Sequence, residues 1–297
     1  MIASLWVLLS CAAWGEQPQL HLIFGGDVML GRRVYVAASV KNDFAYPFRG
    51  VAGEFAGADI AFVNLESPFA AGPPYTEERM VFRAHPSMVE GLKVAGIDVV
   101  STANNHSRDG GDPGLRFTLE VLGRNGIAAV GTALDARQLG QGVVVERKGL
   151  KVGFLAYTFD QRNGNHLDTD ARIAMLHTGV MAGEIRELRK RVDVVVVSMH
   201  AGFEYQNKPN SQQMTVARAA IDAGATVVVG HHPHVTQPVE RYKGGVIFYS
   251  LGNLVFDQDP RPDEGAVGDV FLRGGAVESW RVRKIRIVNG APQFRGD

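Results

Sequence analysis

The sequence contains a single cysteine, Cys11, among 297 residues. No disulfide can therefore form within the chain, and a zinc site built from several thiolates is excluded. The sequence also lacks an excess of charge of one sign, because 31 Lys and Arg residues balance 31 Asp and Glu residues. Since nucleic-acid-binding domains usually carry a basic excess, we expect no nucleic-acid partner.

Apolar runs long enough to cross a membrane are missing as well. The apolar stretch at residues 2–14 is shorter than the ~20 residues that a spanning helix needs. It resembles the core of a signal peptide, and residues 13–15 (AWG) have the small-x-small pattern of a cleavage site. Residues 8–11 (LLSC) offer an alternative, a lipoprotein site that lipidates Cys11. We therefore predict a leader over 1–18 and export to the periplasm or cell surface, with lipid anchoring at Cys11 left open. Because no Lys or Arg precedes the run, an ordinary first strand or a misassigned start is the other interpretation.

After this stretch, apolar runs alternate with amphipathic segments. Helices are predicted over 89–95, 115–124, 180–191 and 212–223, and strands over 21–25, 60–63, 97–101, 143–145, 152–157, 192–198, 226–229, 246–250 and 280–288. This alternation indicates an α/β fold with mostly parallel inner strands, although 143–157 is typical of an antiparallel hairpin. Pro- and Gly-rich loops are expected at 72–76 and 259–268. In the absence of a repeat or a long linker, residues 19–297 are predicted to form one domain.

Polar side chains follow the ends of five predicted strands. They are Asp27, Asn64 with Glu66, Asn105 with His106, His200, and His232 with His234. In open α/β sheets, ligands bind in the crevice outside the carboxyl ends of the strands. We therefore expect these side chains, which are far apart in the sequence, to meet in one cleft.

The chemistry of this set indicates metal binding. Imidazole, carboxylate and amide oxygen ligands suit divalent Mn, Fe, Zn or Co. Two carboxylates and several histidines exceed the needs of one tetrahedral ion, whereas two ions about 3.5–4 Å apart would use them all. The sequence thus predicts two divalent metal ions as cofactors.

Other interpretations remain open for individual residues. Asp27 alone could cap a helix or accept backbone N–H groups in a turn. Asn105 could occupy a left-handed turn, although Asn104 fits that role better. Asn64 is a candidate for a residue that orients the Glu66 carboxylate without binding the metal itself. Single histidines elsewhere are interpreted as structural, namely His85, His166 and His177.

Five segments together resemble a known family. They are FGGDVMLG (24–31), ADIAFVNLESP (58–68), FRAHPSMVEGLKVAGIDVVSTANNHSRDGG (82–111), VVVVSMHAGFEYQNKPN (194–210) and GATVVVGHHPHVTQPVERYKGGVIFYSLGNLVFD (224–257). In this order they resemble the CapA/PgsA-type proteins of poly-γ-glutamate capsule synthesis, over residues 20–257. That family is similar in turn to calcineurin-like metallophosphoesterases and 5′-nucleotidases. The resemblance implies a four-layer α/β/β/α sandwich, a capsule-synthesis membrane complex as partner, and an anionic polymer or a phosphoester as substrate.

The resemblance also implies roles for the matching residues. Asp27 would bind the first metal, and Glu66 would stand where the wider superfamily has a bridging aspartate. Asn105 and His200 would bind the second metal, and His106 would act as an outer acid or charge stabiliser.

The remaining matches belong to the second half of the chain. His232 and His234 would bind one metal each, whereas His231 breaks the His-x-His spacing and is the weaker candidate. Glu204 and Tyr205 would line the substrate side. Asn253 follows a predicted strand and is a candidate for either a site contact or a turn.

Two features depart from the wider superfamily. Met29 stands where its Asp-x-His motif has a histidine, and the bridging carboxylate lies in Asn-Leu-Glu. Ala201 also replaces a tryptophan that the family usually carries. The sequence therefore leaves two functions open. One is a metal-dependent hydrolase, and the other is a non-catalytic, membrane-associated accessory that binds or exports anionic polymer.

Overall fold

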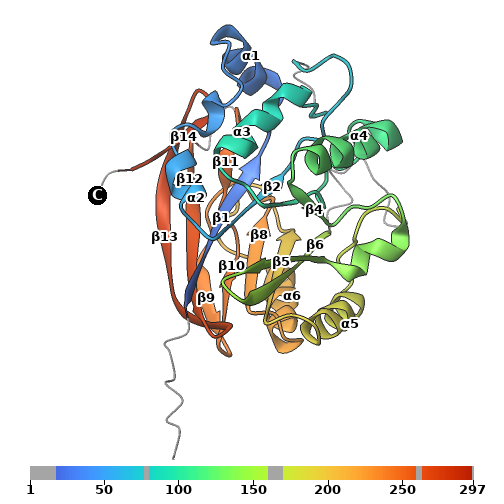
Figure 1. The fold of residues 1–297 in the computed structure, drawn as a ribbon, viewed down its shortest axis with the longest axis vertical. Helices are drawn as coiled ribbons and strands as arrows, with labels where there is room; N and C mark the ends of the chain where they lie inside the picture. The colour runs from blue at the N-terminus through green and yellow to red at the C-terminus, as the bar shows by residue number, and fades with distance from the viewer. Residues whose placement is uncertain (1–17, 77–79, 160–169, 259–262, 296–297) are drawn as a thin grey trace, which may run out of the picture.

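Two β-sheets form the centre of the protein in the computed structural model, which describes residues 18–76, 80–159, 170–258 and 263–295 (Figure 1). The first sheet has the order β14-β13-β12-β1-β2-β3-β4, with β11 paired to the carboxyl end of β1. Its strands are β1 (Gln19–Val28), β2 (Ile60–Leu65), β3 (Val99–Ser101), β4 (Ala128–Val130), β11 (Asn253–Val255), β12 (Glu264–Arg273), β13 (Ala276–Val288) and β14 (Ala291–Phe294). The second sheet has the order β5-β6-β7-β8-β10-β9. Its strands are β5 (Val143–Arg147), β6 (Leu150–Thr158), β7 (Val194–His200), β8 (Val227–His231), β9 (Val239–Tyr242) and β10 (Gly245–Phe248).

Most inner strands of the two sheets are parallel, as the sequence predicts, whereas β12 pairs antiparallel with β1 and β13. β1 to β4 pair in parallel, and so do β6, β7, β8 and β10. The predicted hairpin is the antiparallel pair of β5 and β6. Parallel neighbours end at the same edge of a sheet, so residues that follow them are brought together.

Helices cover the outer face of each sheet. Those on the first sheet are α1 (Arg32–Val40), α2 (Ala52–Ala56), α3 (Val89–Val94) and α4 (Gly111–Arg124), together with the 3₁₀ turns η1 (Tyr46–Phe48) and η2 (Pro86–Met88). Those on the second are α5 (Thr178–Arg189) and α6 (Ser211–Asp222), and η3 (Ala136–Gln141) precedes β5. A reciprocal capping box fixes the start of α6, because the side chain of Asn210 accepts from Gln213 N and the side chain of Gln213 accepts from Asn210 N.

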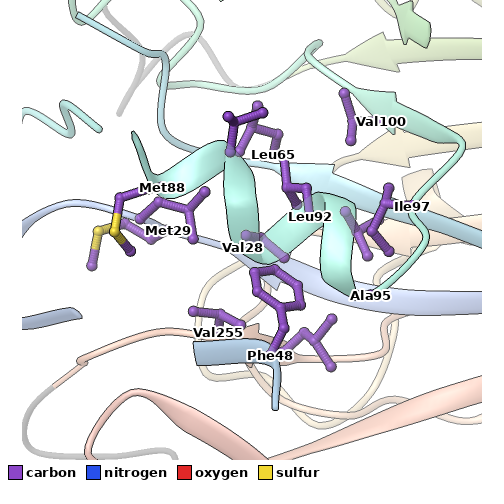
Figure 2. Packing of buried hydrophobic residues seen from close by; sticks show 14 of the residues in the cluster. Val28, Met29, Phe48, Leu65, Met88, Leu92, Ala95, Ile97, Val100 and Val255 are labelled. Atoms are coloured by element: carbon purple, nitrogen blue, oxygen red, sulfur yellow. The ribbon is translucent and has the colours of Figure 1, made fainter. Parts of the chain in front are cut away.

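Three apolar clusters fill the interfaces between these layers. In β7, Val194 and Val196 face the first sheet, whereas Val195 and Val197 face α5 and α6. Successive side chains of a strand point to opposite faces, so a continuous apolar run indicates a strand that is covered on both sides. Figure 2 shows the third interface, where Leu92 of α3 and Phe48 pack over the first sheet. The predicted four-layer α/β/β/α sandwich is therefore confirmed.

One predicted loop is partly wrong. The segment 259–268 was expected to be irregular, but β12 begins at Glu264 and pairs along its length with β13. Glycines in β12 interrupt the apolar pattern that is typical of a strand. Gly265 is needed for close packing, because a Cβ there would lie 1.9 Å from Asn253 O. Residues 1–17 of the predicted leader, including Cys11, lie outside the described residues, as does His166.

Candidate metal centre

The carboxyl ends of strands from both sheets meet in one buried polar cluster. Asp27 lies opposite Asn64 in the parallel register of β1 and β2, and His200 lies opposite His231 in that of β7 and β8. The predicted ligands are brought together, and each is at most 4% exposed: Asp27, Glu66, Asn105, His200, His232 and His234. Among the described residues, the ligand atoms of Asp27, Glu66 and His234 lie within 4.8 Å of one another.

Asp27 is held by donors from several elements. Asn64 Nδ2 donates to its Oδ1 at 2.8 Å, and His232 N donates to its Oδ2 at 3.2 Å. The Nδ1 atoms of His231 and His234 each lie 3.4 Å from one of its oxygens. Burial raises the pKa of Asp27, but these two imidazoles outweigh it and bring that pKa well below its usual range. The side chain is therefore a carboxylate.

A glycine makes the position of Asp27 possible. A Cβ on Gly26 would lie 1.9 Å from Gly252 O, so the backbone there admits no larger residue. This close approach lets Asp27 N donate to Gly252 O at 3.0 Å and sets Asn253 beside Asp27 in the register of β1 and β11.

Glu66 has an unusual environment for a carboxyl group. It is fully buried, and neither of its oxygens accepts a hydrogen bond from any residue that the structure describes. Three imidazole Nε2 atoms surround its Oε1, those of His200 at 3.7 Å, His234 at 3.8 Å and His106 at 4.0 Å. Burial and the charge of Asp27 raise the pKa of Glu66 well above its usual range. A buried carboxyl without donors costs free energy, and a cation at this point would remove that cost.

Further atoms that could bind a cation lie beside Glu66. His200 Nε2 lies 2.8 Å from Asn105 Oδ1, and the ring of His232 is centred 4.9 Å from that of His200. Burial and the neighbouring His232 lower the pKa of His200 well below its usual range, which favours the neutral imidazole that metals require. His234 differs: burial lowers its pKa, but Glu66 and Asp27 outweigh this and raise it to about 9.

Three residues at the site have a backbone conformation that L-residues rarely adopt. His232, His234 and Tyr205 have φ values of 94°, 56° and 61°, in the left-handed region that L-residues rarely adopt. Such strain gathers at functional sites. Tyr205 N donates to Pro233 O at 2.9 Å, so the loops after β7 and β8 brace each other.

Two predictions about asparagines are wrong. Asn104 does not have a positive φ; its Oδ1 accepts from His106 N at 3.1 Å, and its Nδ2 donates to Leu65 O at 2.8 Å. Asn64 does not bind Glu66 but holds Asp27, and it lies 3.3 Å from His200 Nδ1. Both amides thus tie the loops after β2 and β3 to the cluster.

His106 has a partner that sequence reasoning missed. Its Nδ1 lies 2.7 Å from Asp109 Oδ2, and its ring stacks on Phe82 with centroids 3.8 Å apart. The carboxylate fixes the ring orientation and leaves Nε2 facing Glu66. The spacing of three residues between His106 and Asp109 was the available signal.

The remaining predicted residues lie around the cluster, some buried and some exposed. Asn253 Oδ1 lies 2.9 Å from His234 Nδ1, and the half-exposed ring of Tyr205 is centred 6.4 Å from that of His234. Glu204 is close enough to Glu66 to raise the pKa of that carboxyl further. His231, the weaker candidate, is fully buried against Asp27.

Comparison with known proteins identifies the family. The family described as "Bacterial capsule synthesis protein PGA_cap" matches residues 21–258. The chain belongs to the PGA_cap family. PGA biosynthesis protein CapA of Bacillus subtilis (strain 168) is 32% identical over 278 residues, covering 92% of this chain and 73% of that protein. Capsule biosynthesis protein CapA of Bacillus anthracis is 31% identical over 310 residues, covering 99% and 74% respectively.

A solved structure supports the fold of this PGA_cap member. A Staphylococcus aureus protein assigned provisionally as a 5′-nucleotidase, in complex with α-ketoglutarate, matches with a TM-score of 0.56 at 14% identity. The match covers 94% of this chain but only 55% of that protein, so the chain spans about half the length of this structural relative. At this identity the likeness shows a shared fold. Within the described residues of the PGA_cap chain, none of the helices combines the length and apolar character that a membrane crossing requires.

Proposed function

We propose that this PGA_cap protein is a metal-dependent hydrolase with a site for two divalent cations, acting on an anionic polymer or a phosphoester in capsule synthesis. The observation that carries the proposal is Glu66, a buried carboxyl without a hydrogen-bond donor among the described residues, enclosed by three imidazoles. The proposal of an anionic polymer as substrate is supported by membership of a family of capsule-synthesis proteins.

The candidate metal ligands divide into two groups, and Glu66 belongs to both. Asp27 and His234 would hold one cation, and Asn105, His200 and His232 the other. Metal–ligand bonds of about 2.0–2.2 Å put two ligands of one ion roughly 3 Å apart, as His200 Nε2 and Asn105 Oδ1 are at 2.8 Å. The donor set suits Mn, Fe, Zn or Co. Divalent cations there would supply Lewis acidity, which stabilises negative charge on a substrate oxygen.

His106 is the residue of this chain that we assign to proton transfer. Its Nε2 lies 4.0 Å from Glu66 Oε1, and its Nδ1 is held by Asp109. A proton on Nε2 can pass to the leaving oxygen of the substrate while Asp109 stabilises the ring. Its stacking on Phe82 keeps the ring from turning away.

Asp109→Asn should lower kcat for an alkyl phosphodiester about 10- to 100-fold, because a partner that orients a site imidazole typically contributes that much. KM and metal content should stay unchanged, since Asp109 is not assigned to either cation. Asp222→Asn is the matched control, because Asp222 lies at the surface, where it pairs with Lys243 and accepts from the hydroxyl of Tyr242. A change in metal content equal to that in kcat would contradict this role.

One observation favours the alternative of a non-catalytic accessory that binds or exports anionic polymer. Met29, which stands where the wider superfamily has a ligating histidine, is fully buried in the apolar cluster beneath α1 and α3. The Asp27 side therefore has one imidazole fewer and would hold its cation more weakly. We also propose that the protein is exported, on the basis of the leader expected at residues 1–18.

Metal analysis and a hydrolysis assay separate these two functions. The purified protein, loaded with Mn or Zn and desalted, should contain about two ions per chain and should hydrolyse bis-p-nitrophenyl phosphate. Treatment with a chelator should abolish turnover, and adding the metal back should restore it. If the protein binds a γ-linked glutamate polymer but hydrolyses no substrate with any of the metals, the accessory function is favoured. If the purified protein binds no metal, the hydrolase function is ruled out.

A further inference from the structure

A second cavity adjoins the metal centre. It has a volume of about 410 Å³, which lies within the usual range for ligand pockets, and it opens between α1 and the turn from β13 to β14. Its walls include Arg33, Ala37 and Lys41 on one side, and Phe256, Gln258 and Ile287 on the other. We refer to it as the α1 cavity.

The α1 cavity shares part of its wall with the metal centre. The ring of Phe256 is centred 5.0 Å from that of His234. Gln258 Oε1 accepts from Asn253 Nδ2 at 3.1 Å, and Gln258 Nε2 donates to the hydroxyl of Tyr205. Phe256 and Gln258 therefore border both the α1 cavity and the metal centre.

The carboxylates that face the α1 cavity are engaged by arginines. Asp257 accepts from Arg32 Nε at 3.0 Å and from Arg33 N at 2.8 Å. Asp263 lies 3.7 Å from Arg286 Nε. These carboxylates therefore offer little repulsion to an incoming anion.

Lys41 is the cation that the α1 cavity can offer to a ligand. Its Nζ lies 4.7 Å from the centroid of the Tyr46 ring, and no carboxylate of the described residues comes within ion-pair distance of it. Val36, Ala37 and Ile287 supply apolar wall beside it, suited to methylene groups. A chain of carboxylates joined by methylene segments matches this combination.

We propose that the α1 cavity is a subsite for an acidic polymer, in which Lys41 binds a carboxylate several residues along the polymer from the one at the metal centre. This inference rests on the proposed function for the nature of the polymer. It adds a specificity-determining residue outside the cluster of metal ligands, and it predicts that a polymer binds better than its monomer.

Fluorescence anisotropy with a labelled γ-linked glutamate decamer tests the subsite. Lys41→Gln should weaken binding about tenfold, in line with the loss of one charge-assisted contact, and Lys41→Arg should retain it. Ala37→Trp, which fills the α1 cavity, should weaken binding at least as much. Val40→Trp is the matched control, because Val40 is on the same helix, 82% exposed and not in the cavity wall. Free glutamate at equal carboxylate concentration should compete poorly.

The outcomes separate this proposal from the hydrolase. A protein that turns over no phosphodiester but binds the decamer, with loss in Lys41→Gln and Ala37→Trp, would refute the hydrolase and support the subsite. Turnover combined with equal decamer affinity in wild type, Lys41→Gln and Ala37→Trp would refute the subsite alone. A wild-type protein that fails to bind the decamer would refute the subsite as well.

Discussion

Glu66→Gln should reduce turnover of bis-p-nitrophenyl phosphate about a thousandfold, because the metal centre is expected to supply several kcal/mol of transition-state stabilisation. The substitution keeps the size of the side chain but removes the charge that lies among His106, His200 and His234. Both cation groups share this carboxylate, so the metal content should fall for both. Metal analysis and steady-state kinetics on the same preparation measure the two effects together.

A stability measurement checks the same prediction without any assay of activity. Cations at 100 times their Kd should raise the free energy of unfolding of the wild type by about 2.7 kcal/mol per site. The Glu66→Gln variant should gain much less. Glu187→Gln is the matched control, because that carboxyl is 71% exposed and pairs only with Lys190. If Glu66→Gln bound both ions and retained its turnover, the metal centre would have to be placed elsewhere.

His106→Asn should lower kcat for an alkyl phosphodiester by about 10²–10⁴-fold, the usual contribution of a general acid, and leave both ions bound. Unlike Glu66→Gln, His106→Asn should retain its metal content, because His106 is not assigned to either cation. Its Nε2 is the most distant of the three imidazole Nε2 atoms from Glu66 Oε1, at 4.0 Å, and its Nδ1 is held by Asp109. Metal content therefore separates a residue that moves a proton from one that holds a cation.

The leaving group provides a sharper test of the role of His106. A p-nitrophenolate departs without much help from an acid, whereas an alkoxide needs a proton. The loss in His106→Asn should therefore be small for an aryl diester and large for an alkyl diester. His177→Asn, at the exposed start of α5, should behave as wild type toward both. Equal losses for the two substrates would rule out proton donation by His106.

The layers of the fold could be predicted because the central strands are continuous apolar runs in the sequence. Val194–His200 and Val227–His231 begin as unbroken apolar runs, and only strands covered on both faces are built that way. β12 escaped prediction because Gly265 and Gly268 interrupt its pattern, while Asp269 is buried by ion pairs with distant arginines. Local sequence does not report those partners.

The approximate position of the site followed from polar residues at strand ends, but its internal contacts did not. Asn64 is two residues from Glu66 in the chain, yet it holds Asp27, because β1 and β2 set those two side chains in register. The contact between Asp109 and His106 depends on how the loop after β3 folds, which strand ends alone do not predict. The α1 cavity joins residues from the two ends of the domain, so nothing local could indicate it.

The cluster draws its groups from both sheets, and this has a consequence for when it can exist. Asp27 and Glu66 follow strands of the first sheet, whereas His200 and His232 follow strands of the second. Neither sheet alone supplies all of the candidate ligands. Cations can therefore bind at the complete site only after the C-terminal segments of the chain have packed against the N-terminal ones. If the export proposed above precedes folding, the chain would take up the ions that its destination offers, so that the compartment as well as the affinity would decide the identity of the cofactor.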